Sequence, residues 1–349
     1  MTGVLRVRVC LLMVWLMTAG VSARDLPPKV AALIPAAVKE GRVIVWGTTL
    51  NPRQTRQFED SFNAFYGTDI DVETPGGQHT AKSAEVIMAV KSGVPPGMDI
   101  FWTGAAAELI PPGAVQKVNW IEELGVSAEL QLGDYGLRTH DGHPGMLTYN
   151  TRLVKPGDLP KTYFDLLDPR WKGKIAMPRT SAPWVFMSYA LGEEAVAELL
   201  TKIVTTQQPK MLARYADIRT RVIGGEFPMS IGNDAWIQKQ QGAPVDHADL
   251  DIVILQSAGA YIVVGAEHVA AAKLWGYWAV SPEGQKVLEA ARAYSLVETP
   301  GSALAEHAKG KRVVHVPFEW RMEQYNRVQD RYQKIIDSAA GGAASEPAE

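Results

Sequence analysis

The sequence has almost no cysteine. One cysteine occurs in 349 residues, and it is Cys10, inside an apolar run near the N-terminus. A chain without cysteine pairs has no disulfide, so burial of apolar side chains must stabilise the fold, and a chain of this length is sufficient for that. Once the apolar run is removed, thiol catalysis and cysteine-ligated zinc are also excluded.

The sequence also lacks an excess of charge of one sign. It has 35 Lys and Arg against 38 Asp and Glu, and no block of five basic residues. Nucleic-acid binding requires a concentrated basic surface, so no nucleic-acid partner is expected. The remaining composition, with 46% hydrophobic and 21% charged residues, is typical of a folded globular protein. The length favours two packed units over one.

Hydrophobic runs long enough to span a bilayer are absent. The N-terminal run Val9–Met17 is well short of the roughly 20 residues that a span needs. It follows Arg6 and Arg8 and precedes Val21-Ser22-Ala23, a small-residue pattern typical of a secretory cleavage site. We therefore predict that residues 1–23 are a signal peptide and that the protein is periplasmic. An uncleaved membrane anchor is the alternative.

Motifs of local catalytic chemistry are absent as well. The sequence contains no Gly-x-Ser-x-Gly, no phosphate-binding Gly-rich loop, no dinucleotide fingerprint after a strand and no His-Glu-x-x-His. His140 and His143 flank Asp141-Gly142, which is interpreted as a two-residue hairpin turn rather than a metal site. We expect no catalytic residues, no metal and no cofactor. A secreted hydrolase that assembles dispersed His and Asp residues is the enzyme alternative.

Apolar runs of strand length alternate with stretches of helical period along the chain. Asn51-Pro52, for example, supplies an N-cap and a first helical position, and Gly67 ends that helix. This alternation predicts an α/β fold with parallel sheets covered by helices. The predicted strands are Arg42–Trp46, Ile70–Thr74, Asp99–Trp102, Gly145–Asn150, Lys174–Met177, Phe227–Ile231, Ile252–Leu255 and Tyr261–Val264. The predicted helices are Asn51–Gly67, Thr80–Lys91, Pro183–Leu191, Glu194–Thr205, Asp234–Gln241, Glu267–Val280, one opening at Ser281, and Phe318–Asp337.

Small polar residues follow four of these strands and lead towards helices. Ligands of open parallel sheets lie beyond the carboxyl ends of the strands, where free backbone N–H groups at helix starts favour anionic or carbonyl-rich groups. We therefore expect the helix starts to converge on one ligand. The alternative is that these residues only cap their helices. The candidates are Thr48, Thr49, Thr103, Gly104, Arg179, Thr180, Ser181, Asn233 and Asp234.

Charged and aromatic residues at these strand ends suggest two ligand classes. Arg179 favours a carboxylate or phosphate, unless it pairs with a local carboxylate. Asp234 near tryptophans favours an amine through charge pairing and cation–π contact. A zwitterion or a phosphorylated polyol would satisfy both. Four tryptophans could line the cleft or fill the cores; they are Trp46, Trp102, Trp184 and Trp236.

Several longer segments carry a family resemblance. They are Asp99-Ile-Phe-Trp-Thr, Tyr149-Asn-Thr-Arg-Leu-Val, the stretch from Leu159 to Ile175, Gly225-Glu-Phe-Pro-Met-Ser-Ile-Gly-Asn-Asp-Ala-Trp, Gly242-Ala-Pro-Val and Ser281-Pro-Glu-Gly-Gln-Lys. From about Gly41 to Ala291 the chain resembles the periplasmic solute-binding proteins of ABC importers, in the ferric-iron/thiamine/polyamine-like branch. The resemblance implies capture of a small-molecule solute, docking to an inner-membrane ABC permease and a monomeric state.

The resemblance also implies a two-lobed type 2 fold. Each lobe would be a mostly parallel sheet flanked by helices, and two hinge strands, at Gly145–Asn150 and around Leu255–Val264, would cross between the lobes. Residues 41–146 plus 256–295 would form lobe one and residues 147–255 lobe two. C-terminal helices at 296–337 would pack on the lobes, followed by a disordered tail at 338–349.

The ligand is not fixed by the resemblance. Members of this branch that hold bare ferric ion use a His, a Glu and two adjacent tyrosines, and the matching positions here are Leu50, Gly104 and Asp234-Ala235. A ferric ion requires several hard oxygen donors, and Asp234 alone cannot replace them, so naked iron is not expected. As an organic-ligand cleft, the resemblance adds Tyr149 to the candidates, with Trp184 or Trp236 as a stacking wall. A polyamine- or thiamine-like cation and a sensor-type binding protein are the alternatives.

Overall fold

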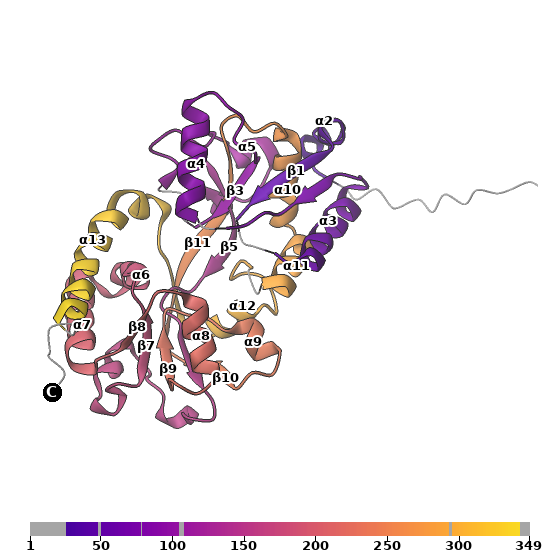
Figure 1. The fold of residues 1–349 in the computed structure, drawn as a ribbon. Coiled ribbons are helices and arrows are strands. Elements are labelled where there is room, and N and C mark those ends of the chain that lie inside the picture. The colour runs from indigo at the N-terminus through magenta and orange to yellow at the C-terminus, as the bar shows by residue number, and fades with distance from the viewer. Residues whose placement is uncertain (1–25, 48–49, 78, 105–107, 293–294, 343–349) are drawn as a thin grey trace, which may run out of the picture.

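The computed structural model describes residues 26–47, 50–77, 79–104, 108–292 and 295–342. The predicted signal peptide and the candidates Thr48 and Thr49 lie outside these residues. Within them the chain forms two sheets, each flanked by helices, in an upper and a lower lobe (Figure 1). The two-lobed α/β architecture predicted from the sequence is confirmed.

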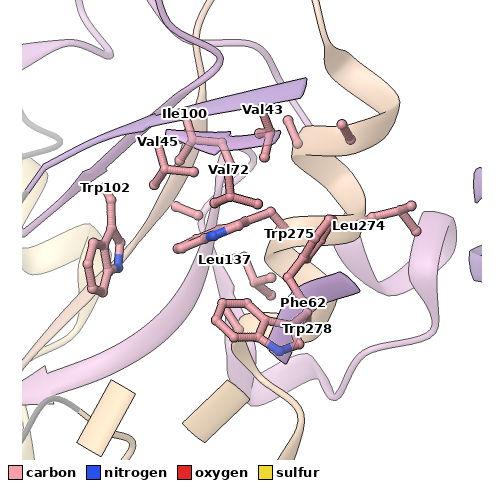
Figure 2. Close-up of a cluster of buried hydrophobic side chains, with 14 of the residues drawn as sticks. Val43, Val45, Phe62, Val72, Ile100, Trp102, Leu137, Leu274, Trp275 and Trp278 are labelled. Carbon is pink, nitrogen blue, oxygen red and sulfur yellow. The ribbon is translucent and has the colours of Figure 1, made fainter. Parts of the chain in front are cut away.

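The first lobe is built on a sheet of seven strands in the described chain. Its order is β2 (Asp71–Glu73), β1 (Arg42–Trp46), β3 (Ile100–Thr103), β11 (Ile252–Ile262), β5 (Gly136–Gly142) and β4 (Gln131–Leu132), with β12 (Arg312–His315) pairing β11. Its helices are α1 (Pro28–Ala31), α2 (Ile34–Glu40), α3 (Pro52–Tyr66), α4 (His79–Lys91), α5 (Trp120–Leu124), α10 (Val269–Ala279) and α11 (Pro282–Arg292). The core between sheet and helices contains Phe62, Trp102, Trp275 and Trp278 (Figure 2).

The second lobe is built on a sheet of five strands in the described chain. Its order is β10 (Val245–His247), β6 (Leu147–Asn150), β9 (Met229–Ile231), β7 (Ile175–Pro178) and β8 (Lys210–Leu212). Its helices are α6 (Ala182–Leu191), α7 (Glu193–Lys202), α8 (Tyr215–Ile223) and α9 (Trp236–Gln240). The C-terminal α12 (Ala303–Ala308) packs under β11, and α13 (Phe318–Gly342) lies against α6 and α7 (Figure 1).

Both sheets are mixed rather than mostly parallel. The parallel pairs β2–β1–β3 and β9–β7–β8 are joined by antiparallel strands where the chain returns from the other lobe. A strand that arrives from the opposite lobe runs against the strands already there, so the direction changes at the junction. The prediction of mostly parallel sheets is corrected in this respect.

The crossing strands differ from the predicted ones. β11 is continuous where two strands were predicted, and its residues pass from the second core at Ile252 and Ile254 to the first core at Ala260 and Ile262. It exchanges its partner from β12 to β5 between Leu255 and Gln256. β6 was predicted to cross, but it pairs with β9 and β10 inside the second sheet. A second crossing is the link between β5 of the first sheet and β6 of the second.

The predicted Asp-Gly hairpin turn is wrong. Asp141 and Gly142 end β5, and the chain turns afterwards, where the Met146 N–H donates to the His143 carbonyl at 3.1 Å. Asp141 is buried because its carboxylate accepts hydrogen bonds from Arg138, from the Ser257 hydroxyl and from a backbone N–H. None of these partners could be read from the local sequence.

The terminal helix is longer than predicted. α13 continues to Gly342, so residues 338–342 belong to the helix and only residues 343–349 of the predicted tail fall outside the described chain. Val328, Tyr332 and Ile336 recur every four residues and are buried in the second core, which fixes this helix to the lobe. The lobe boundaries given above stay predictions.

Candidate functional site

A cavity of about 340 Å³ lies beside the carboxyl ends of β7 and β9, next to the link between β5 and β6. Strand ends of this kind are where α/β sheets bind ligands. Five separate parts of the chain meet there, so the cavity depends on the whole fold. It is lined by Gly142, His143, Pro144, Ala182, Pro183, Phe186, Tyr215, Arg219, Gly232, Asn233, Asp234 and Gln256.

Arg219 of α8 is the one Lys or Arg side chain among the described residues that line this cavity. Its Nε donates to the Asp234 carbonyl at 2.8 Å, and its Nη2 donates to Asn233 Oδ1 at 3.2 Å. Asn233 in turn donates from Nδ2 to the Tyr215 carbonyl at 3.0 Å, which ties the loop after β9 to the start of α8. A guanidinium has five N–H donors, so donors remain beyond these two bonds for an anionic group.

Gly232 allows the loop after β9 to approach α6. Its φ is +76°, and a Cβ at this position would lie 2.7 Å from Pro183 Cγ. An L-residue would therefore be strained and would push Pro183 out of the wall. The close approach places Asn233 and Asp234 opposite the first turn of α6.

A second cavity of about 130 Å³ adjoins the first and shares Phe186 and Gln256 with it. Gly104 and Glu108 of the first lobe line one side, and α13 lines the other with Arg321, Tyr325, Asn326 and Gln329. The Gly104 carbonyl accepts hydrogen bonds from Arg321 and, at 3.4 Å, from Gln256. The two cavities together form a cleft between the lobes.

Tyrosine hydroxyls face this cleft in the neutral form. Tyr215 is 38% exposed, but desolvation at the cavity wall, with a smaller effect of the neighbouring Tyr325, raises its pKa to about 12. Burial also raises the pKa of Tyr325. Both hydroxyls therefore keep their protons at neutral pH and can donate hydrogen bonds to an anion.

The predicted site residues are only partly brought together. Gly104, Asn233 and Asp234 line the cleft. Thr103 is buried at the end of β3, where its hydroxyl lies 3.3 Å from Nδ1 of His79. His79 opens α4 and was not among the candidates.

The start of α6 does not offer free amides. The Ser181 N–H donates to Gln333 Oε1 at 3.0 Å, the Ser181 hydroxyl donates to the Gln329 carbonyl at 3.0 Å, and the Ala182 N–H donates to Thr180 Oγ1 at 3.3 Å. Arg179 is exposed and lines neither cavity. The expectation of free amides at this helix start is wrong, because α13 packs over it and Gln333 accepts from the Ser181 N–H.

Two other helix starts are also satisfied internally. A capping box between Asn51 and Gln54 begins α3, and the Ala235 N–H before α9 donates to Nε2 of His247 at 3.0 Å. In the described residues no α-helix follows Gly104 before α5. Capping therefore explains these polar residues better than a ligand does.

The predicted aromatic wall is also corrected. Trp46 and Trp102 are buried in the first lobe, and Trp184, with no exposed surface, and Tyr149 belong to the second core. Trp236 differs from the other three tryptophans, because it belongs to none of these cores. It stacks on the ring of His247, with the ring centroids 3.7 Å apart. The aromatic residues that line the cleft are Phe186, Tyr215 and Tyr325.

Three histidines group beside the cleft: His143, His247 and His307, which we call the hinge histidine cluster. Trp236 contacts the rings of His247 and His307. The His143 and His307 rings lie 6.1 Å apart, and the His247 and His307 rings 6.3 Å apart. Burial and neighbouring positive charge lower the pKa of His143 to about 3 and of His307 to about 4. Among the described residues no group of three His, Cys, Asp or Glu side chains is arranged to hold a metal ion.

Neither α8 nor Arg219 was predicted from the sequence. The signal was present, because Ile218 and Val222 are four residues apart and both are buried. Arg321 and Tyr325 lie on α13, a helix that was predicted. The spacing of apolar residues in the sequence does not show which face of this helix meets the first lobe.

Comparison with known proteins identifies the family. Residues 57–315 match the model of the bacterial extracellular solute-binding proteins, and the chain belongs to this family. Across the described helices, none has both the length and the apolar character that crossing a membrane requires.

The relatives are distant. The chain is 25% identical over 205 residues to the major ferric iron-binding protein of Neisseria meningitidis serogroup A, covering 55% of this chain and 60% of that protein's length. It is 27% identical over 281 residues to an uncharacterized protein of Haemophilus influenzae, covering 73% and 78%.

Solved structures share the fold. Iron-bound HitA from Pseudomonas aeruginosa has a TM-score of 0.66 at 17% identity and covers 84% of this chain and 99% of its own. AfuA from Actinobacillus pleuropneumoniae, with fructose-6-phosphate bound, has a TM-score of 0.66 at 18% identity and covers 85% and 99%. The fold is that of the type 2 periplasmic binding proteins.

Proposed function

We propose that the protein is the periplasmic substrate-binding component of an ABC importer and that it captures a small anionic or zwitterionic solute between its lobes. The observation that carries this proposal is Arg219, which lines a cavity of about 340 Å³ beside Asn233 and Asp234. A cavity of this size is at the lower end for small-molecule sites. The solute would contact both lobes, favour the closed state and present that state to the permease.

Bare ferric ion is not the proposed ligand, although similar proteins bind iron. At the positions that correspond to the ferric-ion ligands of the family, this chain has Leu50, Gly104 and Asp234-Ala235. No metal-binding group occurs in the described chain. Other proteins of this fold are recorded with fructose-6-phosphate and with agropinic acid, both anionic organic molecules. Such ligands suit a guanidinium with spare donors.

A polyamine- or thiamine-like cation is the second candidate. The carboxylate-bearing residues Asp234 and Glu108 line the two cavities and support it. The two candidates differ in the sign of the ligand charge, so a panel of ligands separates them.

Native mass spectrometry of protein purified from its own host, followed by thermal melting, tests the proposal. We expect a retained small anion or zwitterion, which at one hundred times its Kd should stabilise the fold by about 2.7 kcal/mol and raise the melting temperature by several degrees. A panel of sugar phosphates, carboxylates, amino acids, polyamines and thiamine identifies the class. No retained molecule and no shift with any class would contradict the proposal, and turnover of a bound compound would favour an enzyme.

A further inference from the structure

Arg321 is a buried cation without a matching anion. It is 5% exposed; its Nη1 donates to the Ser257 carbonyl at 2.7 Å and its Nη2 to the Gly104 carbonyl. Among the described residues no carboxylate forms an ion pair with it. Arg138, which is as deeply buried, is paired with Asp141 and Glu298. A buried charge that lacks a counterion is costly, so an unpaired one is uncommon.

Arg321 lines the smaller cavity together with other donors, and it also lines a separate cavity of about 310 Å³ beside Arg138 and Glu298. Residues 321, 325 and 329 are four apart and so lie on one face of α13, and all three line the cavity. Tyr325 keeps its proton because burial raises its pKa. Gln256 adds an amide from β11. Glu108 is the acidic residue of this cavity, but it is exposed and water screens its charge.

The two cavities place two guanidinium groups along one cleft. Arg219 lines the larger cavity and Arg321 the smaller, and the shared walls are Phe186 and Gln256. About 130 Å³ accommodates a carboxylate or phosphate group, since a water molecule occupies about 30 Å³ in the liquid. The larger cavity would hold the rest of the molecule.

We propose that Arg321 binds a second anionic group of the transported solute, so that the ligand is a small molecule with two separated negative charges. Dicarboxylates and phosphorylated hydroxy acids have this chemistry. This inference rests on the proposed function, because it concerns the same cleft. The ligand's second charge would supply the counterion that Arg321 lacks. Arg321 also joins α13 to Gly104 of the first lobe, so an anion bound there would hold the lobes together.

Titration calorimetry with matched pairs of probes tests this inference. The pairs are glutarate with butyrate and 3-phosphoglycerate with glycerate, which differ in the second anionic group. We expect the wild-type protein to bind at least one dianion 30-fold or more tightly than its monoanionic partner. Arg321→Gln should reduce this preference to about threefold while the monoanion keeps its affinity.

Arg327→Gln is the matched control. Arg327 lies on the same helix, but it is exposed and pairs with Glu193, so its loss should leave both affinities unchanged. If Arg321→Gln does not fold, the comparison of dianion and monoanion affinities in the wild-type protein still tests the proposal. Equal binding of dianion and monoanion would overturn the role of Arg321 and leave the proposed function intact. Failure of every anion, with binding of a cation, would overturn the anionic class itself.

Discussion

Replacing Asp141 with alanine should lower the free energy of unfolding by about 3–5 kcal/mol, because it leaves a buried cation without its main partner. Asp141 Oδ1 accepts from Arg138 Nε at 2.9 Å and from the Ser257 hydroxyl at 3.0 Å. Its Oδ2 accepts from the Val297 N–H at 3.0 Å. The variant would leave Arg138 with Glu298, whose side chain is 52% exposed. Chemical denaturation of both proteins measures the difference.

Asp134→Ala is the control for this variant. Asp134 pairs with Lys117 at 2.8 Å, but both side chains are about two-thirds exposed, at 69% and 68%. An exposed pair contributes about 0–1 kcal/mol, so this loss should be small. Equal effects of the two variants would contradict the stabilising role given to the buried pair. Since Asp141 joins β5 to β11 through Ser257, the stability of the crossing strands depends on it.

Acidification below pH 6.5 should destabilise the protein through the hinge histidine cluster. Burial lowers the pKa of His143 to about 3 and of His307 to about 4, and it also lowers the pKa of His247. The unfolded chain, with a pKa near 6.5, therefore takes up protons before the folded chain does. The contribution of the neutral histidines to the free energy of unfolding is complete above pH 7 and is lost as the pH falls from about 6.5 towards 4.

Burial sets the direction of this effect, and the surrounding charges modify its size. Lys311 and Lys239 add positive charge near the cluster, while Asp246 and Asp249 partly offset it at His307. A histidine that stays neutral on folding costs up to about 1.4 kcal/mol for each pH unit below its unfolded pKa. Between pH 6.5 and 5.5 the three together should lower the free energy of unfolding by roughly 3 kcal/mol.

Denaturation curves of the wild type and His143→Gln at several pH values check this prediction. The variant should lose roughly 1 kcal/mol of the decline between pH 6.5 and 5.5, while His140, whose pKa burial also lowers to about 4, keeps its own contribution. His315→Gln, which changes an exposed histidine of β12, is the control and should behave as the wild type. A decline of the same size in all three proteins would assign the effect to groups outside the cluster.

Local sequence signals predicted helices and strands whose ends are set by neighbouring residues in the chain. α3 begins at an Asn51 capping box with Pro52 in its first turn and ends before Gly67 in the left-handed conformation, as expected. β1 was predicted with its observed bounds, because a short β-branched run is buried on both faces. Family resemblance supplied the two-lobed arrangement.

The errors concern contacts that join distant parts of the chain. Ser181 looked like a ligand-binding helix start, but Gln329 and Gln333 satisfy it from about 150 residues away. Asp141 was predicted to be a turn residue, but its buried carboxylate accepts hydrogen bonds from the Ser257 hydroxyl and the Val297 N–H. Arg179 follows β7, and Arg219 lies on α8, which follows β8. Only the packing of α8 in the folded chain shows that Arg219 lines the cavity and Arg179 does not.

The direct test of a solute site centred on Arg219 is a comparison of Arg219→Gln with Arg179→Gln by titration with the solute that the wild type retains. The account predicts a 30-fold or greater loss of affinity for Arg219→Gln, partial recovery in Arg219→Lys, and wild-type affinity for Arg179→Gln, with melting curves showing that all three variants are folded. Unchanged affinity in folded Arg219→Gln, or a loss confined to Arg179→Gln, would contradict it.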